Sequence, residues 1–141
     1  MKQPFFVFLF LFPFIAFTQE HYLFIGTYTS SGNEGIYVYK FNSTTAESKL
    51  ISSAKTSNPS FLAVSNNQKF LYAVNENDPG TVTAFSFNRD SGTLTKLNEV
   101  ITAGAHPCYI SINKKGNNAV IGNYSGGNIS VLGINSNGTI S

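Results

Sequence analysis

Three observations predict an all-β fold, and specifically a β-propeller of which only part is present. The chain repeats itself 48 positions apart, so that Asn58-Pro59 lies over His106-Pro107. Each repeat contains short segments rich in Val, Ile, Phe, Tyr and Thr, separated by clusters of Gly, Asn, Asp and Pro, as β-strands and turns require. No stretch has the apolar period of a helix. Four strands repeated at such a spacing are typical of one propeller blade.

The first segment predicts a secretory signal peptide over residues 1–18. A positively charged start precedes an apolar run from Phe5 to Phe17, which is shorter than the roughly 20 residues of a membrane-spanning helix. Ala16 and Thr18 are small enough for cleavage after residue 18. We therefore expect export, periplasmic or secreted, without a stable membrane anchor, and a propeller domain over residues 19–141. A membrane anchor is the weaker alternative.

The repeat units are unequal. The first unit offers three strand-like segments, which match the second, third and fourth strands of the other units, at residues 22–26, 35–41 and 49–54. The second unit offers four, at residues 58–65, 70–75, 80–87 and 92–95. The third also offers four, at residues 106–113, 118–123, 127–134 and 138–141. Two and a half to three blades cannot close a ring that needs at least about four. We expect the remaining blades to lie outside this sequence.

Composition excludes several kinds of site. A single cysteine excludes an intrachain disulfide, so the apolar core must hold the fold. The formal charge is +2 and the lysines are scattered, which is unlike a nucleic-acid-binding surface. Two histidines and one cysteine are too few and too far apart for a metal site. We expect no metal, no cofactor and no nucleic acid, and a small-molecule partner.

The motifs resemble the 6-phosphogluconolactonase family, which includes carboxymuconate cyclases. They lie, in the family's order, at residues 25–29, 35–37, 58–63, 71–76, 106–109 and 122–131. The resemblance covers residues 22–141 and implies a seven-bladed propeller that hydrolyses a sugar lactone, or in one branch interconverts a muconate and its lactone. For the cyclase branch it also implies that the catalytic His, Arg and Glu lie beyond residue 141. Because the cleft is built by groups from several blades, residues 19–141 alone should be inactive. Tyr109 departs from the family's pattern, which often has His there.

Polar residues follow the second strand of every unit, and such residues converge on one face of a propeller. Opening a lactone needs a base that activates water and donors for the developing oxyanion. Glu76 could be the base or a substrate anchor, and the neighbouring amides and phenols could be donors. The structural alternative is that the asparagines hold turns and the tyrosines cover the inner rim. The candidate residues are Thr27, Tyr28, Asn75, Glu76, Asn123 and Tyr124.

Three further features each have two interpretations. His106 could carry a proton near neutral pH, or could start a turn while the following proline holds it extended. Cys108 is expected to be a small buried apolar residue, although a nucleophile is the alternative. Gly126-Gly127 fits a hairpin between two strands better than a phosphate loop, because no helix follows.

The sequence therefore leaves three functions open. The first is hydrolysis of a sugar lactone outside the cytoplasm, where an unphosphorylated substrate fits better than a phosphorylated one. The second is an exported propeller that binds carbohydrate or protein without catalysis, since a fold alone does not fix a function. The third is a muconate-lactonising cyclase.

Overall fold

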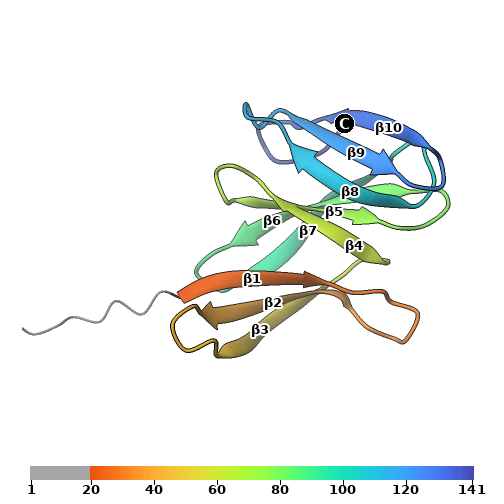
Figure 1. The fold of residues 1–141 in the computed structure, drawn as a ribbon. Coiled ribbons are helices and arrows are strands. Elements are labelled where there is room, and N and C mark those ends of the chain that lie inside the picture. Colours follow the sequence, from red (N-terminus) through yellow and green to blue (C-terminus); the bar gives the residue numbers. More distant parts are fainter. Residues whose placement is uncertain (1–19) are drawn as a thin grey trace, which may run out of the picture.

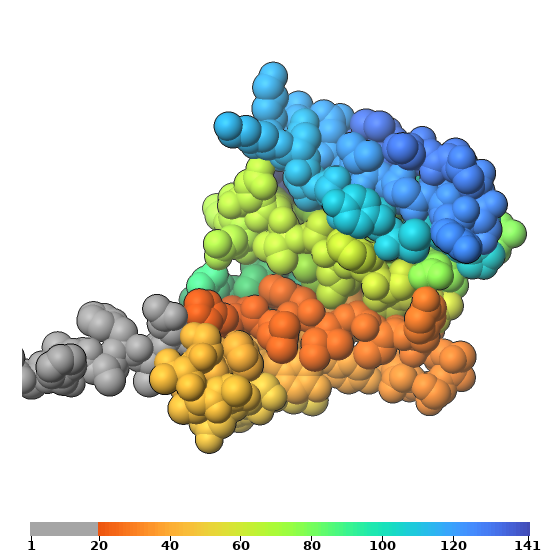
Figure 2. All heavy atoms as spheres, in the orientation of Figure 1, coloured from red at the N-terminus to blue at the C-terminus, as the bar shows by residue number. Residues whose placement is uncertain are grey.

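The computed structural model describes residues 20–141 as three antiparallel β-sheets stacked as successive layers (Figures 1 and 2). The first sheet contains β1 (Glu20–Gly26), β2 (Gly35–Asn42) and β3 (Ser48–Lys55), in that order. The second contains β4 (Pro59–Val64), β5 (Phe70–Asn75), β6 (Thr81–Asn88) and β7 (Thr93–Ile101), in that order. The third contains β8 (Pro107–Ile112), β9 (Asn118–Asn123) and β10 (Asn128–Gly133), with β9 in the middle. The described part of the chain is thus all-β, as predicted.

The middle sheet is buried on both faces, which explains its continuous apolar strands. In β5, Leu71 and Ala73 pack towards the first sheet in a cluster with Ile36, whereas Tyr72 and Val74 pack towards the third sheet. Successive side chains of a strand point to opposite faces, so one strand serves two cores. Stacking of the sheets therefore supplies most of the apolar burial.

The predicted strands agree closely with the observed ones. The segments predicted at residues 70–75 and 118–123 coincide with β5 and β9, and β1 pairs with β2 as the second strand of a unit should. The fourth strand predicted at residues 138–141 is reduced to one bridge, between Ile134 and Ile140. Backbone hydrogen bonds between Gly133 and Ser141 and between Asn135 and Thr139 flank this bridge.

The outer faces of the stack carry exposed apolar side chains. On the first sheet, Leu23 and Ile25 are each 39% exposed, and on the third sheet Ile129 and Val131 are 73% and 63% exposed. Among the described residues, β1 pairs only with β2, so its other edge has no ladder partner. The described residues contain no helix that is long and apolar enough to cross a membrane. The predicted signal peptide lies outside the described residues.

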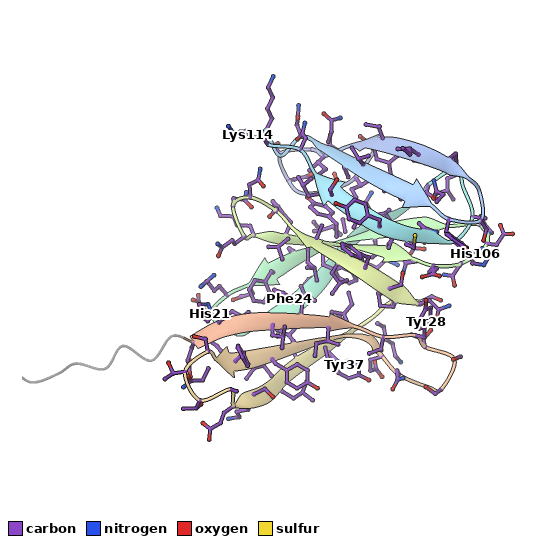
Figure 3. The ribbon with its side chains drawn as sticks, in the orientation of Figure 1. His21, Phe24, Tyr28, Tyr37, His106 and Lys114 are labelled. Atoms are coloured by element: carbon purple, nitrogen blue, oxygen red, sulfur yellow. The ribbon has the colours of Figure 1, made fainter. Side chains whose placement is uncertain are left out.

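The strand ends form two rims. The polar rim holds the ends of β1, β5 and β9 and the starts of β4 and β8, and Tyr28 and His106 mark it in Figure 3. The opposite rim holds the β4–β5, β6–β7 and β8–β9 turns, and His21 and Lys114 mark it. Because β1, β5 and β9 run in the same direction, residues that follow them reach the same rim.

Candidate functional site

The polar rim brings together the residues that follow β1, β5 and β9. Tyr28, Glu76 and Tyr124 are 48 positions apart in the sequence and occupy the same place in successive sheets. Stacking therefore turns one repeat position into a row of neighbouring side chains along the rim. The ends of β1, β5 and β9, which these residues follow, lie at one rim, where Figure 3 labels Tyr28.

Tyr28 and Glu76 are in direct contact. The Tyr28 hydroxyl donates a hydrogen bond of 2.9 Å to Oε2 of Glu76, which joins the first sheet to the second. This bond raises the pKa of Tyr28 above its usual 10.0, with smaller contributions from burial and from the negative charges of Glu76 and Cys108. The phenol therefore stays protonated at neutral pH and remains a donor.

A chain of amides runs beneath this pair from sheet to sheet. The backbone N–H and the hydroxyl of Thr29 donate to Oδ1 of Asn58, at 2.9 and 3.0 Å. Nδ2 of Asn58 donates to Oδ1 of Asn77 at 2.8 Å, and the backbone N–H of His106 donates to the Asn77 carbonyl at 2.9 Å. This chain fixes the positions of the three strand ends relative to one another.

Sequence reasoning missed the role of Asn58 and Asn77. A signal for Asn58 existed, because the 48-residue period places it over His106. No comparable signal marks Asn77, since its partners Asn58 and His106 are distant in the sequence and are unknown until the strands are assembled.

Asn75 lies under the rim and is only 1% exposed. Its Nδ2 donates to the Thr56 hydroxyl at 2.6 Å and to the Ser57 carbonyl at 2.5 Å, and its Oδ1 accepts from the Thr83 hydroxyl at 2.7 Å. The Thr56 and Thr83 hydroxyls lie 3.1 Å apart, which closes a ring of three side chains. Each member can donate one bond and accept one bond around this ring. These internal bonds fit the structural role for Asn75.

The ring continues to the surface through Glu99. The hydroxyls of Thr81 and Thr83 lie 3.0 and 3.3 Å from its carboxylate oxygens, and Nζ of Lys96 lies 2.7 Å from Oε2. Burial alone would raise the pKa of Glu99, but the bonds and charge of these partners outweigh burial and lower the pKa below 4.5. The carboxylate is thus held in its charged form beside the sheet edge.

Asn123 occupies the place of Asn75 in the third sheet but has different partners. It is 3% exposed, and its Nδ2 donates to the Ser130 hydroxyl at 2.9 Å, while that hydroxyl donates to the Thr102 carbonyl. Gly104 replaces Thr56, and the Asn123 side chain lies against its Cα. Oδ1 of Asn123 has no donor among the described residues. The third sheet therefore has no counterpart of the closed ring.

The backbone of His106 differs from the prediction of an extended residue. Its φ is 49°, in the left-handed region, and Asn58 has a φ of 43° at the equivalent place. A following proline disfavours the right-handed helical region, and Asn and His are among the residues that enter the left-handed one most readily. The His106 carbonyl accepts the Tyr124 N–H at 3.0 Å, which holds this turn, while Nδ1 is buried without a partner in the described chain.

The predicted burial of Cys108 is wrong, because its side chain is exposed. Pro107 pairs with Asn123 and Tyr109 with Gly122, so Cys108 is the extra residue of a β-bulge. A bulge changes the direction of its side chain, and β8 lies at the edge of its sheet. The thiol consequently faces the polar rim instead of the core.

The remaining candidates are placed as follows. The hydroxyl of Thr27 donates to the Gly35 carbonyl at 3.0 Å, within its own hairpin. Tyr124 is 80% exposed, and Tyr109 is 49% exposed with its ring 5.0 Å from that of Phe61. Gly127 has a φ of 62° and its N–H bonds to the Asn123 carbonyl at 3.0 Å, which confirms the predicted hairpin. Tyr28, Glu76 and Tyr124 therefore form the accessible part of the site.

Comparisons with known proteins agree with this architecture. A family model described as lactonase, 7-bladed beta-propeller, matches residues 22–141. The 6-phosphogluconolactonase of Bacillus subtilis is 32% identical over 122 residues, which are 83% of this chain and 34% of that protein. This chain thus spans about a third of the length of the curated relatives it matches.

Solved structures give the same result. A Bacteroides fragilis protein, described as a candidate 6-phosphogluconolactonase, has a TM-score of 0.83 and 45% identity, over 86% of this chain and 34% of its own. A periplasmic gluconolactonase of Pseudomonas aeruginosa has a TM-score of 0.81 and 33% identity, over 86% of this chain and 36% of its own.

Proposed function

Because this chain belongs to the lactonase family of seven-bladed β-propellers, we propose that the protein hydrolyses a sugar lactone. The polar rim supplies one sector of the cleft in which this reaction takes place. The matched residues make up about a third of the length of the Bacillus subtilis relative, so the complete ring carries the activity and these residues contribute to it. Neither a metal nor a cofactor is needed for this chemistry when a base and oxyanion donors are positioned.

The contact between Tyr28 and Glu76 is the observation that carries this proposal. A lactone opens when water attacks its carbonyl carbon, a base takes a proton from the water, and a donor stabilises the oxyanion. Glu76 is placed to take that proton or to bind a sugar hydroxyl. Tyr28, whose raised pKa keeps it protonated, is placed to donate.

The charges of the polar rim favour an unphosphorylated lactone. The rim carries one lysine, Lys55, whose Nζ lies 3.9 Å from a carboxylate oxygen of Glu34. Glu76 and Asp78 add two further carboxylates after β5. A phosphate group needs cationic partners, and this sector would repel it.

The test measures proton release from gluconolactone, above the spontaneous rate, in the complete protein. We expect Glu76→Gln to lower kcat/KM by about 10²-fold or more, the usual contribution of a general base. Tyr28→Phe should lower it by about 10²-fold if the phenol stabilises the oxyanion. Asp78→Asn is the matched control, because it removes a neighbouring carboxylate that has no contact with the pair. Equal activity in all four proteins would contradict the proposal.

Carbohydrate binding without hydrolysis is the second candidate, and the exposed tyrosines favour it. Tyr28, Tyr109 and Tyr124 are 56%, 49% and 80% exposed at or near the polar rim. Aromatic faces combined with amides can bind a sugar ring without any reaction. In this case gluconate binding would weaken in Tyr124→Ala, and no lactone would be turned over faster than in buffer.

Export is part of the proposal. It rests on the positive start and the apolar run that ends at Phe17, which have the form of a signal peptide. Intact-mass measurement of the protein recovered outside the cytoplasm should show the loss of about 18 residues. An unprocessed protein that retains Met1 and stays in the cytoplasm would contradict export, without bearing on the lactonase activity.

A further inference from the structure

A cleft lies at the opposite rim, between the first and second sheets and away from the polar rim. Its volume is about 420 Å³, within the range of small-molecule sites. The β4–β5 turn forms one wall, the start of β1 forms another, and Arg89 of the β6–β7 turn stands at its edge. His21 also lines it and marks its position in Figure 3.

Arg89 is held in place by two neighbours. Its Nη1 donates to Oε1 of Gln68 at 2.8 Å, and its guanidinium carbon lies 5.9 Å from the centre of the Tyr22 ring. The Tyr22 hydroxyl donates to the Arg89 carbonyl at 2.6 Å, which ties the turn to the first sheet. One of the five guanidinium N–H donors is thus used within the described chain, and the other four are available.

The walls of the cleft combine aromatic rings with uncharged polar groups. The Phe87 ring packs edge-on against Tyr22 at 4.8 Å and against Phe24 at 5.0 Å, and Phe70 lies beside them. The described lining contains no Asp or Glu. An anionic ligand in this cleft would therefore contact the Arg89 guanidinium and the aromatic rings, and no carboxylate of the lining would repel it.

The rim around the cleft is cationic. Six lysines and arginines lie at or near this rim, compared with three carboxylates, Glu20, Glu47 and Asp90. The cationic residues are Lys40, Lys49, Lys69, Arg89, Lys114 and Lys115. The polar rim has the reverse balance, so the two rims attract ligands of opposite charge.

We propose that this cleft binds a small organic oxyanion that carries a flat ring. A guanidinium with free N–H groups matches the geometry of phosphate and carboxylate oxygens, and the ring of the ligand packs on Phe87 and its neighbours. The site is separate from the polar rim and does not depend on the lactonase activity.

The experiment titrates the full chain with phenyl phosphate and with benzoate, followed by NMR. We expect shifts at the amides of Gln68 and Phe87 and none at His106 or Tyr124 of the polar rim. Both ligands should bind if any oxyanion suffices, whereas binding of phenyl phosphate alone assigns the site to phosphates. Phenol, which has the ring without the charge, should bind at least tenfold more weakly, since the charge-assisted bonds contribute 1.4 kcal/mol or more, about tenfold.

Arg89→Gln and Lys114→Gln are the decisive pair. Both remove one positive charge from the same rim, but Lys114 lies outside the cleft. We expect Arg89→Gln to weaken binding about tenfold and Lys114→Gln to change it less than about twofold. Arg89→Lys keeps the positive charge but loses the planar, two-pronged arrangement of guanidinium N–H donors, and should weaken binding about threefold. Equal effects of the two glutamine variants, or shifts confined to the polar rim, would overturn the proposal.

Discussion

Replacing Asn75 and Asn123 by leucine, one at a time, compares the same repeat position in two environments. Leucine has the same branched side-chain skeleton as asparagine but no polar group, so each substitution removes the polar bonds without leaving a cavity. Asn75 has three internal hydrogen bonds, and Asn123 has one and an unpartnered carboxamide oxygen. The two substitutions should therefore have different costs.

The expected costs follow from the number of bonds that each asparagine makes. A typical hydrogen bond contributes about 1 kcal/mol net, so Asn75→Leu should destabilise the fold by about 3 kcal/mol. It also leaves the Ser57 carbonyl without its Asn75 donor, whereas the Thr83 hydroxyl keeps its contacts with Thr56 and Glu99. Asn123→Leu loses one bond but removes a buried oxygen that has no donor, whose desolvation costs about 1–3 kcal/mol. Its net effect should therefore lie between about zero and a stabilisation of about 2 kcal/mol.

Urea unfolding of the full chain, followed by circular dichroism, measures both costs from the shift in midpoint at a common slope. Amide hydrogen exchange in β5 and β9 provides a second measurement that does not require a two-state transition. An Asn123→Leu cost as large as that of Asn75→Leu would refute the reasoning, because it would show that the Asn123 oxygen has a donor of its own.

Two other predictions concern the same sheets. Glu99→Gln should lower the stability by about 0.5 kcal/mol near neutral pH, as expected for an exposed ion pair. Because the pKa of Glu99 is lowered in the folded state, its contribution is present above pH 4.5 and is lost as the pH falls through the folded-state value, so wild type and variant should converge in urea midpoints at low pH. Gly104→Ala would place a Cβ 2.3 Å from the Asn123 side chain and should cost about 1–3 kcal/mol by thermal unfolding. Adding Asn123→Gly removes both the carboxamide and the Cβ, which would lie 2.6 Å away, and should recover part of that loss; a double variant as unstable as the single one would contradict this explanation.

The sheets could be predicted from the sequence because each strand is marked by its own residues. The run Phe70–Asn75 is apolar since both of its faces are buried, and the polar turns on either side define its ends. The repeat then supplied the boundaries of the other units. The largest differences are at residues 138–141, where the predicted strand is reduced to one bridge, and at residues 92–95, where the observed strand extends over Thr93–Ile101.

The site was less predictable because its contacts cross between sheets. The repeat placed Tyr28, Glu76 and Tyr124 on one rim, but it did not indicate that the first two are bonded. Burial of Cys108 was expected from strand alternation, which a bulge interrupts. The extended form of His106 was expected from the proline rule, which restricts the right-handed region and does not exclude a positive φ.

The bond between Tyr28 and Glu76 also limits how similar the repeats can become. Propeller units arise by duplication, and recombination between copies tends to make them identical. If the second unit were copied over the first, position 28 would become glutamate and two carboxylates would face each other across the interface. Two carboxylates there would repel each other, whereas the Tyr28 hydroxyl donates a hydrogen bond to the Glu76 carboxylate. Divergence at this position of the repeat therefore replaces a contact between like charges by a hydrogen bond between the first two units.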